Sequence, residues 1–297
     1  MNTETIYSDA AARGWIPWAI LTPFLGIAFV VGTALPLDPV LAHYLLADPK
    51  TGDPVGFAGL VAFLLGPFAA LGLVVLGWTA LVERRPFATI GLGGRNPLLT
   101  FAIGLLSGLA MIIAILGIIW AQGGVTVGAF FPAVGAMGAL AGIVILLACF
   151  ALQSSVEELV FRGWMLSSIA RRLGPVAAIV LSTAVFTLLH FGRDANALTL
   201  INTGLFALFA CGWALRAGNV WGVMGWHAGW NWLLGTGFQL PVTGIDTHLP
   251  ALLVQLTPQG SSYLTGGAYG PEDTIAATLV LTVGTLLSLL PRRVAHS

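Results

Sequence analysis

Three polar residues interrupt a long apolar stretch in the middle of this chain. Within ACFALQSSVEELVFRGWMLSSIARR, residues 148–172, Glu157, Glu158 and Arg162 lie among apolar neighbours. Placing an ionisable side chain inside a membrane helix costs about 3 kcal/mol or more, so such residues indicate a functional site. The alternative is an ion-pair cluster that only holds helices together.

Helical spacing separates the two acids. Glu158 and Arg162 are four residues apart, so they share a helix face and can form an ion pair. Glu157 lies about 100° further round the helix and points elsewhere. We therefore predict that Glu158 is neutralised and that Glu157 is free. A free carboxylate can take a proton from water as a general base.

Two histidines and an asparagine could complete such a site. His190 lies in STAVFTLLHFGRD, and His227 lies in VMGWHAGWNWLL. His227 and Asn231 are four residues apart, so both can project into one cavity. Phe186 precedes His190 by one turn, and we expect it to pack beside the imidazole and shield it from lipid. A single histidine in a membrane often makes only a hydrogen bond between helices.

Distances along the helices place these groups at a similar depth. At 1.5 Å per residue, Glu157 is about 20 Å from Arg171, and Asn231 is about 22 Å from Arg216. We expect the polar groups of three helices to meet in a middle layer of the membrane.

The three motifs occur together in a recognisable order. EELVFR at 157–162, FTLLH at 186–190 and HAGWN at 227–231 match Glu-Glu-x-x-x-Arg, Phe-x-x-x-His and His-x-x-x-Asn. In this order the chain resembles the CPBP intramembrane proteases. This group contains the CAAX-processing endopeptidases and the bacteriocin-processing or self-immunity proteins. The resemblance covers about residues 140–235, and we interpret 136–236 as the catalytic helices of this type.

The resemblance implies hydrolysis of a peptide bond within the membrane, without a covalent intermediate. Glu157 would activate water with help from His190, while His227 and Asn231 would donate to the oxyanion. Such donors stabilise a tetrahedral oxyanion strongly in a dry site. Three further residues would support the site, with Arg162 holding Glu158 and Phe186 beside the histidine.

A zinc-dependent version uses the same residues. Glu157, His190 and His227 could supply a His2Glu set with an open fourth position. There is no H-E-x-x-H pair, however, and Asn231 beside His227 suits an oxyanion hole better. We therefore favour a mechanism without a cofactor.

Serine and cysteine chemistry are less favoured. Ser154, Ser155 and Ser182 lie near the acids, but the chain has no G-x-S-x-G elbow, so we interpret them as packing hydroxyls. Cys149 and Cys211 lie in apolar stretches and are interpreted as small buried hydrophobes.

Two other functions fit the same residues. In a transporter or channel, Glu157 and the histidines would carry protons or bind a cation, although no internal repeat is visible. A scaffold would retain the motifs without cleaving anything.

The elements that must position these residues are membrane helices. Of the 297 residues 57% are hydrophobic, and the mean hydropathy is +0.93. We predict an all-α polytopic membrane protein, a single domain of residues 1–297 that forms a bundle of about eight transmembrane helices. The predicted spans are 14–35, 56–82, 98–120, 136–168, 174–191, 197–215, 218–236 and 274–291.

The basic residues predict an orientation with cytoplasmic N- and C-termini. The positions on the cytoplasmic side would be Arg13, Arg84, Arg85, Arg95, Arg162, Arg171, Arg172, Arg216, Arg292 and Arg293. Only Lys50 and Arg193 would lie outside. The external loop 237–272 would carry a short helix at 249–256.

We expect a multi-pass protein of the cell membrane. Its partners would be a membrane-associated protein or peptide substrate and the lipid bilayer, with no nucleic acid. The sequence indicates no oligomeric state.

Overall fold

Helices dominate the fold, as the composition predicts. The computed structural model describes residues 6–192 and 196–289. It is 68% helical, which confirms the all-α class. The long helices are α1 (Leu21–Ala34), α3 (Gly56–Gly77), α4 (Pro97–Ala121), α5 (Ala139–Glu158), α6 (Leu166–Leu189), α7 (Ala197–Ala217), α8 (Trp221–Trp232) and α10 (Ile275–Leu289).

Shorter elements join them. Two short α-helices are α2 (Asp38–His43) and α9 (Ser262–Thr265), and the 3-10 segments are Phe87–Ile90, Pro132–Gly135 and Pro271–Asp273. Three π-helical segments extend longer helices, namely Trp78–Val82, Leu159–Met165 and Leu233–Gly237. Strands β1 (Val125–Phe130) and β2 (Val254–Pro258) pair antiparallel.

Five helical stretches are long and apolar enough to cross a membrane: Leu21–His43, Gly56–Val82, Pro97–Ala121, Ala139–Leu189 and Ala197–Ala217. The fourth has 51 residues and contains two of the predicted spans. Two further predicted spans correspond to α8 with its π-helical extension and to α10, which are shorter. Each of the eight predicted spans thus contains a helix, and the chain is a multi-pass membrane protein.

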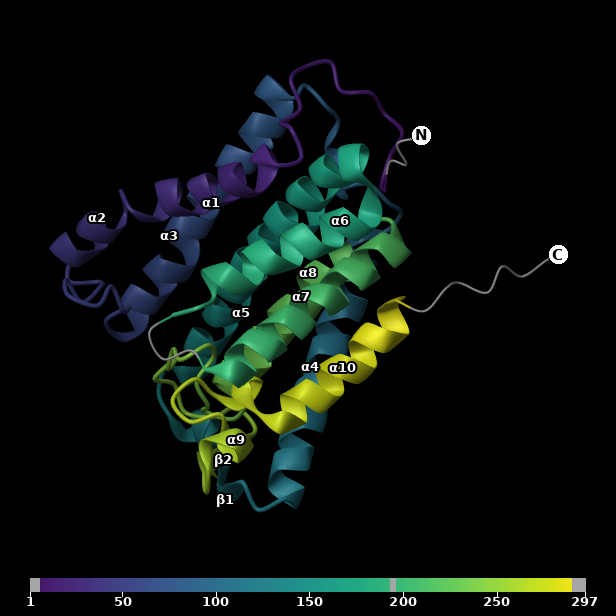
Figure 1. The fold of residues 1–297 in the computed structure, drawn as a ribbon. Coiled ribbons are helices and arrows are strands. Elements are labelled where there is room, and N and C mark those ends of the chain that lie inside the picture. Colours follow the sequence, from purple (N-terminus) through teal and green to yellow (C-terminus); the bar gives the residue numbers. More distant parts are fainter. Residues whose placement is uncertain (1–5, 193–195, 290–297) are drawn as a thin grey trace.

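A sharp bend divides the 51-residue stretch. Gly174 has φ 79° and ψ 171°, a conformation outside the helical region that glycine adopts without a Cβ penalty. Pro175 follows and has no N–H to continue the helix. The chain reverses here, within α6, so the part of α6 after Gly174 runs opposite to α5. Figure 1 shows the arrangement of these helices.

Helix α8 carries two of the predicted site residues and packs closely on α4. An added Cβ at Gly108 would lie 2.2 Å from the Trp226 carbonyl oxygen, and one at Gly225 would lie 1.9 Å from that of Phe101. Only glycine allows two backbones to approach this closely. These contacts fix the position of α8 against α4.

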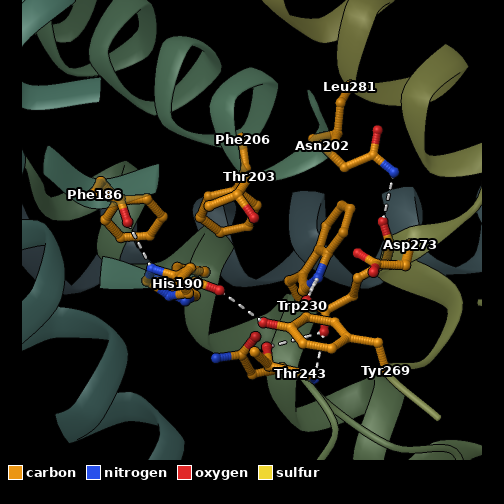
Figure 2. A pocket seen from close by; sticks show the side chains of 13 residues that line it. Phe186, His190, Asn202, Thr203, Phe206, Trp230, Thr243, Tyr269, Asp273 and Leu281 are labelled. Atoms are coloured by element: carbon orange, nitrogen blue, oxygen red, sulfur yellow. Dashed lines mark hydrogen bonds between the residues drawn. The ribbon is translucent and has the colours of Figure 1, made fainter. Parts of the chain in front are cut away.

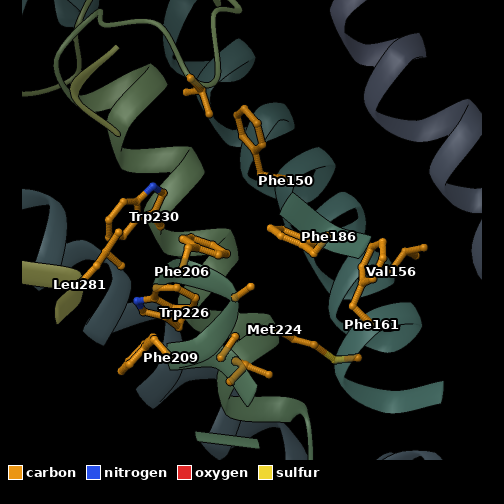
Figure 3. Packing of buried hydrophobic residues seen from close by; sticks show 14 of the residues in the cluster. Phe150, Val156, Phe161, Phe186, Phe206, Phe209, Met224, Trp226, Trp230 and Leu281 are labelled. Atoms are coloured by element: carbon orange, nitrogen blue, oxygen red, sulfur yellow. The ribbon is translucent and has the colours of Figure 1, made fainter. Parts of the chain in front are cut away.

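An aromatic cluster packs on the inner side of α8 (Figure 3). The ring centroids of Phe206 and Trp226 are 4.3 Å apart, and Phe209 meets Trp226 edge-on at 4.6 Å. Trp230 packs edge-on against Phe206 at 5.6 Å. This cluster joins α7 to α8 and forms one wall of the polar site.

The bundle has two different ends, which we name the loop end and the arginine end (Figure 1). The loop end holds β1, β2, α9 and the connection 238–274. The arginine end holds the start of α1, the turn at Gly174 and the end of α10. Residues 249–253 are not helical, and 254–258 form β2, so the predicted helix at 249–256 is wrong. The backbone of this segment pairs with β1 instead.

The charges used for orientation need two corrections. Arg85, counted above as cytoplasmic, is buried and pairs with Glu83, so it is not an anchor at the membrane surface. Arg162, counted above as cytoplasmic, is completely buried and pairs with Glu158, so it is not an anchor at the membrane surface. Arg193, Arg292 and Arg293 lie outside the described residues. The orientation itself stays a prediction.

Candidate active site

Glu158 is held by two partners. Its Oε1 accepts hydrogen bonds from Nη1 of Arg162 at 3.2 Å and from Nδ1 of His227 at 2.9 Å. Both Glu158 and Arg162 have 0% exposure. The predicted ion pair is confirmed. The contact with His227, which joins α5 to α8, was not predicted.

Glu157 is not held by hydrogen bonds in this way. Its side chain is mostly buried, and within the described part of the chain its Oε2 has no hydrogen-bond partner. The nearest ring nitrogen is Nε2 of His227, 3.9 Å away. Glu157 is the second-last residue of α5, just before the π-helical segment Leu159–Met165. Such π segments are frequent at functional sites, where they change the direction of side chains.

His227 lies between the two glutamates. Because a carboxylate oxygen can only accept, Nδ1 of His227 carries the proton shared with Glu158. The other ring nitrogen, Nε2, therefore points towards Glu157. To donate a hydrogen bond through Nε2 as well, the imidazole must hold a second proton. Phe206 packs edge-on against the ring at 4.8 Å and fixes its plane.

His190 caps α6 at the loop end. Its Nδ1 donates to the carbonyl oxygen of Phe186 at 2.8 Å, and the two rings stack at 4.3 Å. The predicted contact between these residues is present. Since Nδ1 carries the proton, Nε2 of His190 is the nitrogen that can accept one. The hydroxyl of Tyr269 donates to the carbonyl of His190 at 3.2 Å, as Figure 2 shows.

Phe186 also contacts the buried cation. The guanidinium carbon of Arg162 lies 4.2 Å from the centre of the Phe186 ring, within cation-π range. One aromatic ring thus connects the Glu158–Arg162 pair to His190.

Asn231 has a partner that sequence reasoning missed. Its Nδ2 donates to Oε1 of Gln153 at 3.1 Å, and both side chains are buried. Gln153 is on α5, four residues before Glu157, so it lies on the same helix face. The sequence signal that could have indicated Gln153 was a polar amide four residues before Glu157 in an otherwise apolar helix. Ser154 also donates to Gln153, at 3.0 Å.

Two cavities meet at these residues. One, of about 160 Å³, is lined by Gln153, Glu157, His190 and Asn231 together with apolar side chains. The other, of about 40 Å³, is lined by His190, His227 and Asn231 and by residues of the loop end (Figure 2). All four predicted catalytic residues therefore line a cavity, and His190 and Asn231 line both.

Carboxylates of the loop end close the smaller cavity. Glu272 accepts from Nε1 of Trp230 at 2.8 Å and from the backbone N–H of Thr243 at 2.6 Å. Asp273 accepts from the Thr199 hydroxyl and from Nδ2 of Asn196 at 3.3 Å. These bonds attach the connection 238–274 to α7 and α8.

Burial changes the acidity of two groups in this cover. Desolvation raises the pKa of the Asp273 carboxyl to about 6, against the opposing effect of the hydrogen bond from Thr199. The nearby charge of Glu272 raises it further. Desolvation also raises the pKa of the Tyr269 hydroxyl, so this hydroxyl stays a donor to His190.

The residues proposed for zinc are not assembled as a metal site. Across residues 6–192 and 196–289, no group of three or more His, Cys, Asp or Glu side chains could hold a metal ion. Glu157 and His227 approach each other, but Nδ1 of His190 is bonded to its own helix.

The serines and cysteines lie where packing explains them. Ser182 donates to the carbonyl of Phe161 at 2.8 Å, between α6 and the π-helical segment. Cys149 and Cys211 are free and buried.

Comparison with known proteins supports the same class. Residues 138–233 match the model of the family described as type II CAAX prenyl endopeptidase Rce1-like. No curated protein and no solved structure matches the sequence. The match covers about a third of the chain and contains all three motifs. It confirms the resemblance to the CPBP and CAAX protease family over this segment and supports an intramembrane protease at the level of the family.

Proposed function

We propose that this protein is an intramembrane endopeptidase that hydrolyses a peptide bond with water activated by Glu157. The observation that carries the proposal is the difference between the two neighbouring glutamates. Glu158 is bonded to Arg162 and His227, whereas Glu157 keeps an unpartnered oxygen beside a cavity that also holds His190 and Asn231.

The reaction balances with these groups alone. Glu157 takes one proton from water, and Nε2 of His190 accepts a hydrogen bond from the same water molecule. The water oxygen then attacks the carbonyl carbon. The oxyanion receives hydrogen bonds from Asn231 and from Nε2 of His227. Glu157 then returns its proton to the leaving nitrogen, and the C–N bond breaks to give an acid and an amine.

The ring of His227 lies between the two carboxylates. Its Nδ1 is 2.9 Å from Glu158 and its Nε2 is 3.9 Å from Glu157.

The test is a comparison of new protein N-termini in membranes from cells that express wild type or Glu157→Gln at matched levels. We expect a set of termini present only with the wild type. Asp246→Asn is the control, because this carboxylate is exposed in the loop and lines neither cavity. Identical sets from wild type and a folded Glu157→Gln protein would contradict the proposal and favour transport or scaffolding, which proton flux would test next.

Metal independence is tested on the same reaction. We expect purified wild type to keep its activity after treatment with a zinc chelator, because no step uses a metal. Loss of activity on chelation, restored by added zinc, would favour the metal-dependent version with Glu157, His190 and His227 as ligands.

A further inference from the structure

An open cavity of about 820 Å³ lies at the arginine end of the bundle, separate from the two cavities of the candidate active site. The N-terminal segment forms one wall, and the end of the α3 helix with the residues after it forms the other. The lining includes Ala10, Arg13, Ala80, Arg84, Arg85 and Phe87. A volume of several hundred Å³ is typical of sites that bind small molecules.

Backbone hydrogen bonds hold the two walls together. The N–H of Arg13 donates to the carbonyl oxygen of Arg84 at 3.2 Å, and the N–H of Gly14 donates to that of Glu83 at 2.9 Å. A Cβ at Gly14 would lie 2.0 Å from the carbonyl oxygen of Val82, so only glycine allows this approach. The two arginines therefore lie on adjacent segments and line the same cavity.

The N-terminal wall is also attached to α6. Nη2 of Arg171 donates to the carbonyl oxygen of Ala10 at 3.4 Å, and Nη2 of Arg172 donates to that of Ile16 at 3.2 Å. The cavity is therefore bordered by segments that are fixed before any ligand binds, which lowers the entropic cost of binding.

Arg85 does not supply a charge for a ligand. It is buried, pairs with Glu83, and donates to the hydroxyls of Ser167 at 2.9 Å and Ser168 at 2.8 Å. Its guanidinium group thus holds the connection after α3 against the segment before Gly174.

Arg13 and Arg84 remain available. Both are exposed, and within residues 6–192 and 196–289 neither forms an ion pair. Asp9 is on the same segment as Arg13, but it does not line the cavity, and its charge interacts with that of Arg171. Two guanidinium groups therefore face one cavity without a carboxylate partner. Guanidinium groups bind phosphate through paired N–H donors.

The backbone of Arg84 is strained. Its φ of 48° is in the left-handed region, which is unfavourable for residues with a Cβ and which glycine adopts freely. Strain of this kind concentrates at functional sites. The chain has an arginine where a glycine would relieve the strain, which points to a use of the side chain.

Exposed apolar side chains surround the cavity. Trp15 and Trp18 are exposed on the N-terminal segment, and Leu81 and Phe87 are exposed beside Arg84. Tryptophan is enriched where membranes meet water. In a multi-pass membrane protein these apolar groups contact acyl chains, while the arginines reach the layer of lipid phosphates.

We propose that this cavity binds the phosphate headgroup of an anionic phospholipid through Arg13 and Arg84. The flanking apolar side chains favour a lipid over free phosphate, since they contact its acyl chains. The arginine end is also the end predicted to face the cytoplasm, where the membrane surface carries anionic lipids. The binding is independent of the proposed hydrolysis.

The test is native mass spectrometry of the full chain in detergent with phosphatidylglycerol or phosphatidylcholine that carry the same acyl chains. We expect wild type to retain phosphatidylglycerol preferentially. Arg84→Gln should weaken its binding about 10-fold, because a charge-assisted hydrogen bond is lost. Arg95→Gln is the matched control, since Arg95 is exposed and does not line the cavity. Equal retention of both lipids by wild type, or an equal loss in both variants, would overturn the proposal.

A second variant separates lipid binding from folding. Arg84→Gly removes the side chain and relieves the left-handed strain, so we expect thermal stability without lipid to be at least that of wild type. Its binding of phosphatidylglycerol should fall as in Arg84→Gln. Wild-type affinity in Arg84→Gly would overturn the proposal.

Inorganic phosphate tests the source of the headgroup. We expect phosphatidylglycerol to raise the Tm of wild type, because a ligand that binds only the folded state stabilises it. Inorganic phosphate alone should leave the Tm unchanged. A rise with inorganic phosphate equal to that with the lipid would show a site for the free anion and overturn the assignment to a phospholipid.

Discussion

The two adjacent glutamates differ because each one faces a different part of the bundle. Glu158 faces Arg162 and His227, and Glu157 faces the cavity. Identical side chains one residue apart can therefore serve stability and chemistry separately, which makes substitution of each one informative.

Glu158→Gln should destabilise the protein far more than Glu157→Gln. Removing one partner of a buried ion pair leaves an uncompensated charge, here on Arg162, and costs about 3–5 kcal/mol. Unfolding of the purified variants in detergent measures this difference. If Glu157→Gln unfolds the protein and Glu158→Gln does not, the assigned roles are reversed.

Gln153→Leu should lower kcat about 100-fold with little change in KM. Asn231 would lose the acceptor that orients its amide, and a misplaced catalytic group typically costs this much. The double variant with Asn231→Ala separates positioning from a general effect. If Gln153 acts through Asn231, adding Gln153→Leu to Asn231→Ala changes kcat no further; an additive loss would contradict this role.

Contacts within one helix could be predicted from the sequence, and contacts between helices could not. The Glu158–Arg162 pair and the Phe186–His190 stack follow from a spacing of four residues. The bond between Gln153 and Asn231 depends on how α5 crosses α8, which no local spacing specifies.

At the scale of elements, the position of α8 depends on the glycine contacts with α4. Gly108 and Gly225 meet the facing backbones, and Gly104 and Gly229 do the same. The sequence alone does not indicate that α4 is the helix against which these glycines pack. The same holds for residues 249–256, where a local helix was predicted although β1, more than a hundred residues away, supplies the pairing.

Gly225→Ala should prevent correct packing of α8 and abolish activity. The new Cβ would lie 1.9 Å from the Phe101 carbonyl oxygen, so the backbones must separate and displace His227 and Asn231. Gly117→Ala is the matched control on α4, because its Cβ would meet nothing within 4 Å. Gel filtration and thermal unfolding in detergent compare the two. Equal stability of both variants would contradict this role of the glycine contacts.

At the scale of the whole molecule, the connection 238–274 forms a cover that is attached by two carboxylates, the half-buried Glu272 and the buried Asp273. Asp273 is the titrating member of this cover, since its pKa is raised to about 6 from 3.8 by burial. The folded state therefore holds the proton more tightly than the unfolded state does. Its contribution to stability is greatest below pH 4 and is lost as the pH rises through about 6.

Asp273→Asn should remove this pH dependence. We expect wild type to lose stability relative to Asp273→Asn as the pH rises from 4 to 7, with no further relative change above that. Thermal unfolding of both proteins over this range provides the measurement. If wild type instead gained stability relative to Asp273→Asn as the pH rises, Asp273 would be ionised in the folded protein already at low pH.

The pairing of β1 with β2 also sets an order of assembly. Val125 pairs with Pro258, so β1 is synthesised long before its partner strand. Glu157, His190, His227 and Asn231 all precede β2 in the chain, and so do the helices that carry them. During biosynthesis the candidate catalytic residues are therefore synthesised before the connection that covers them, and the nascent chain passes through a stage in which the candidate site is uncovered.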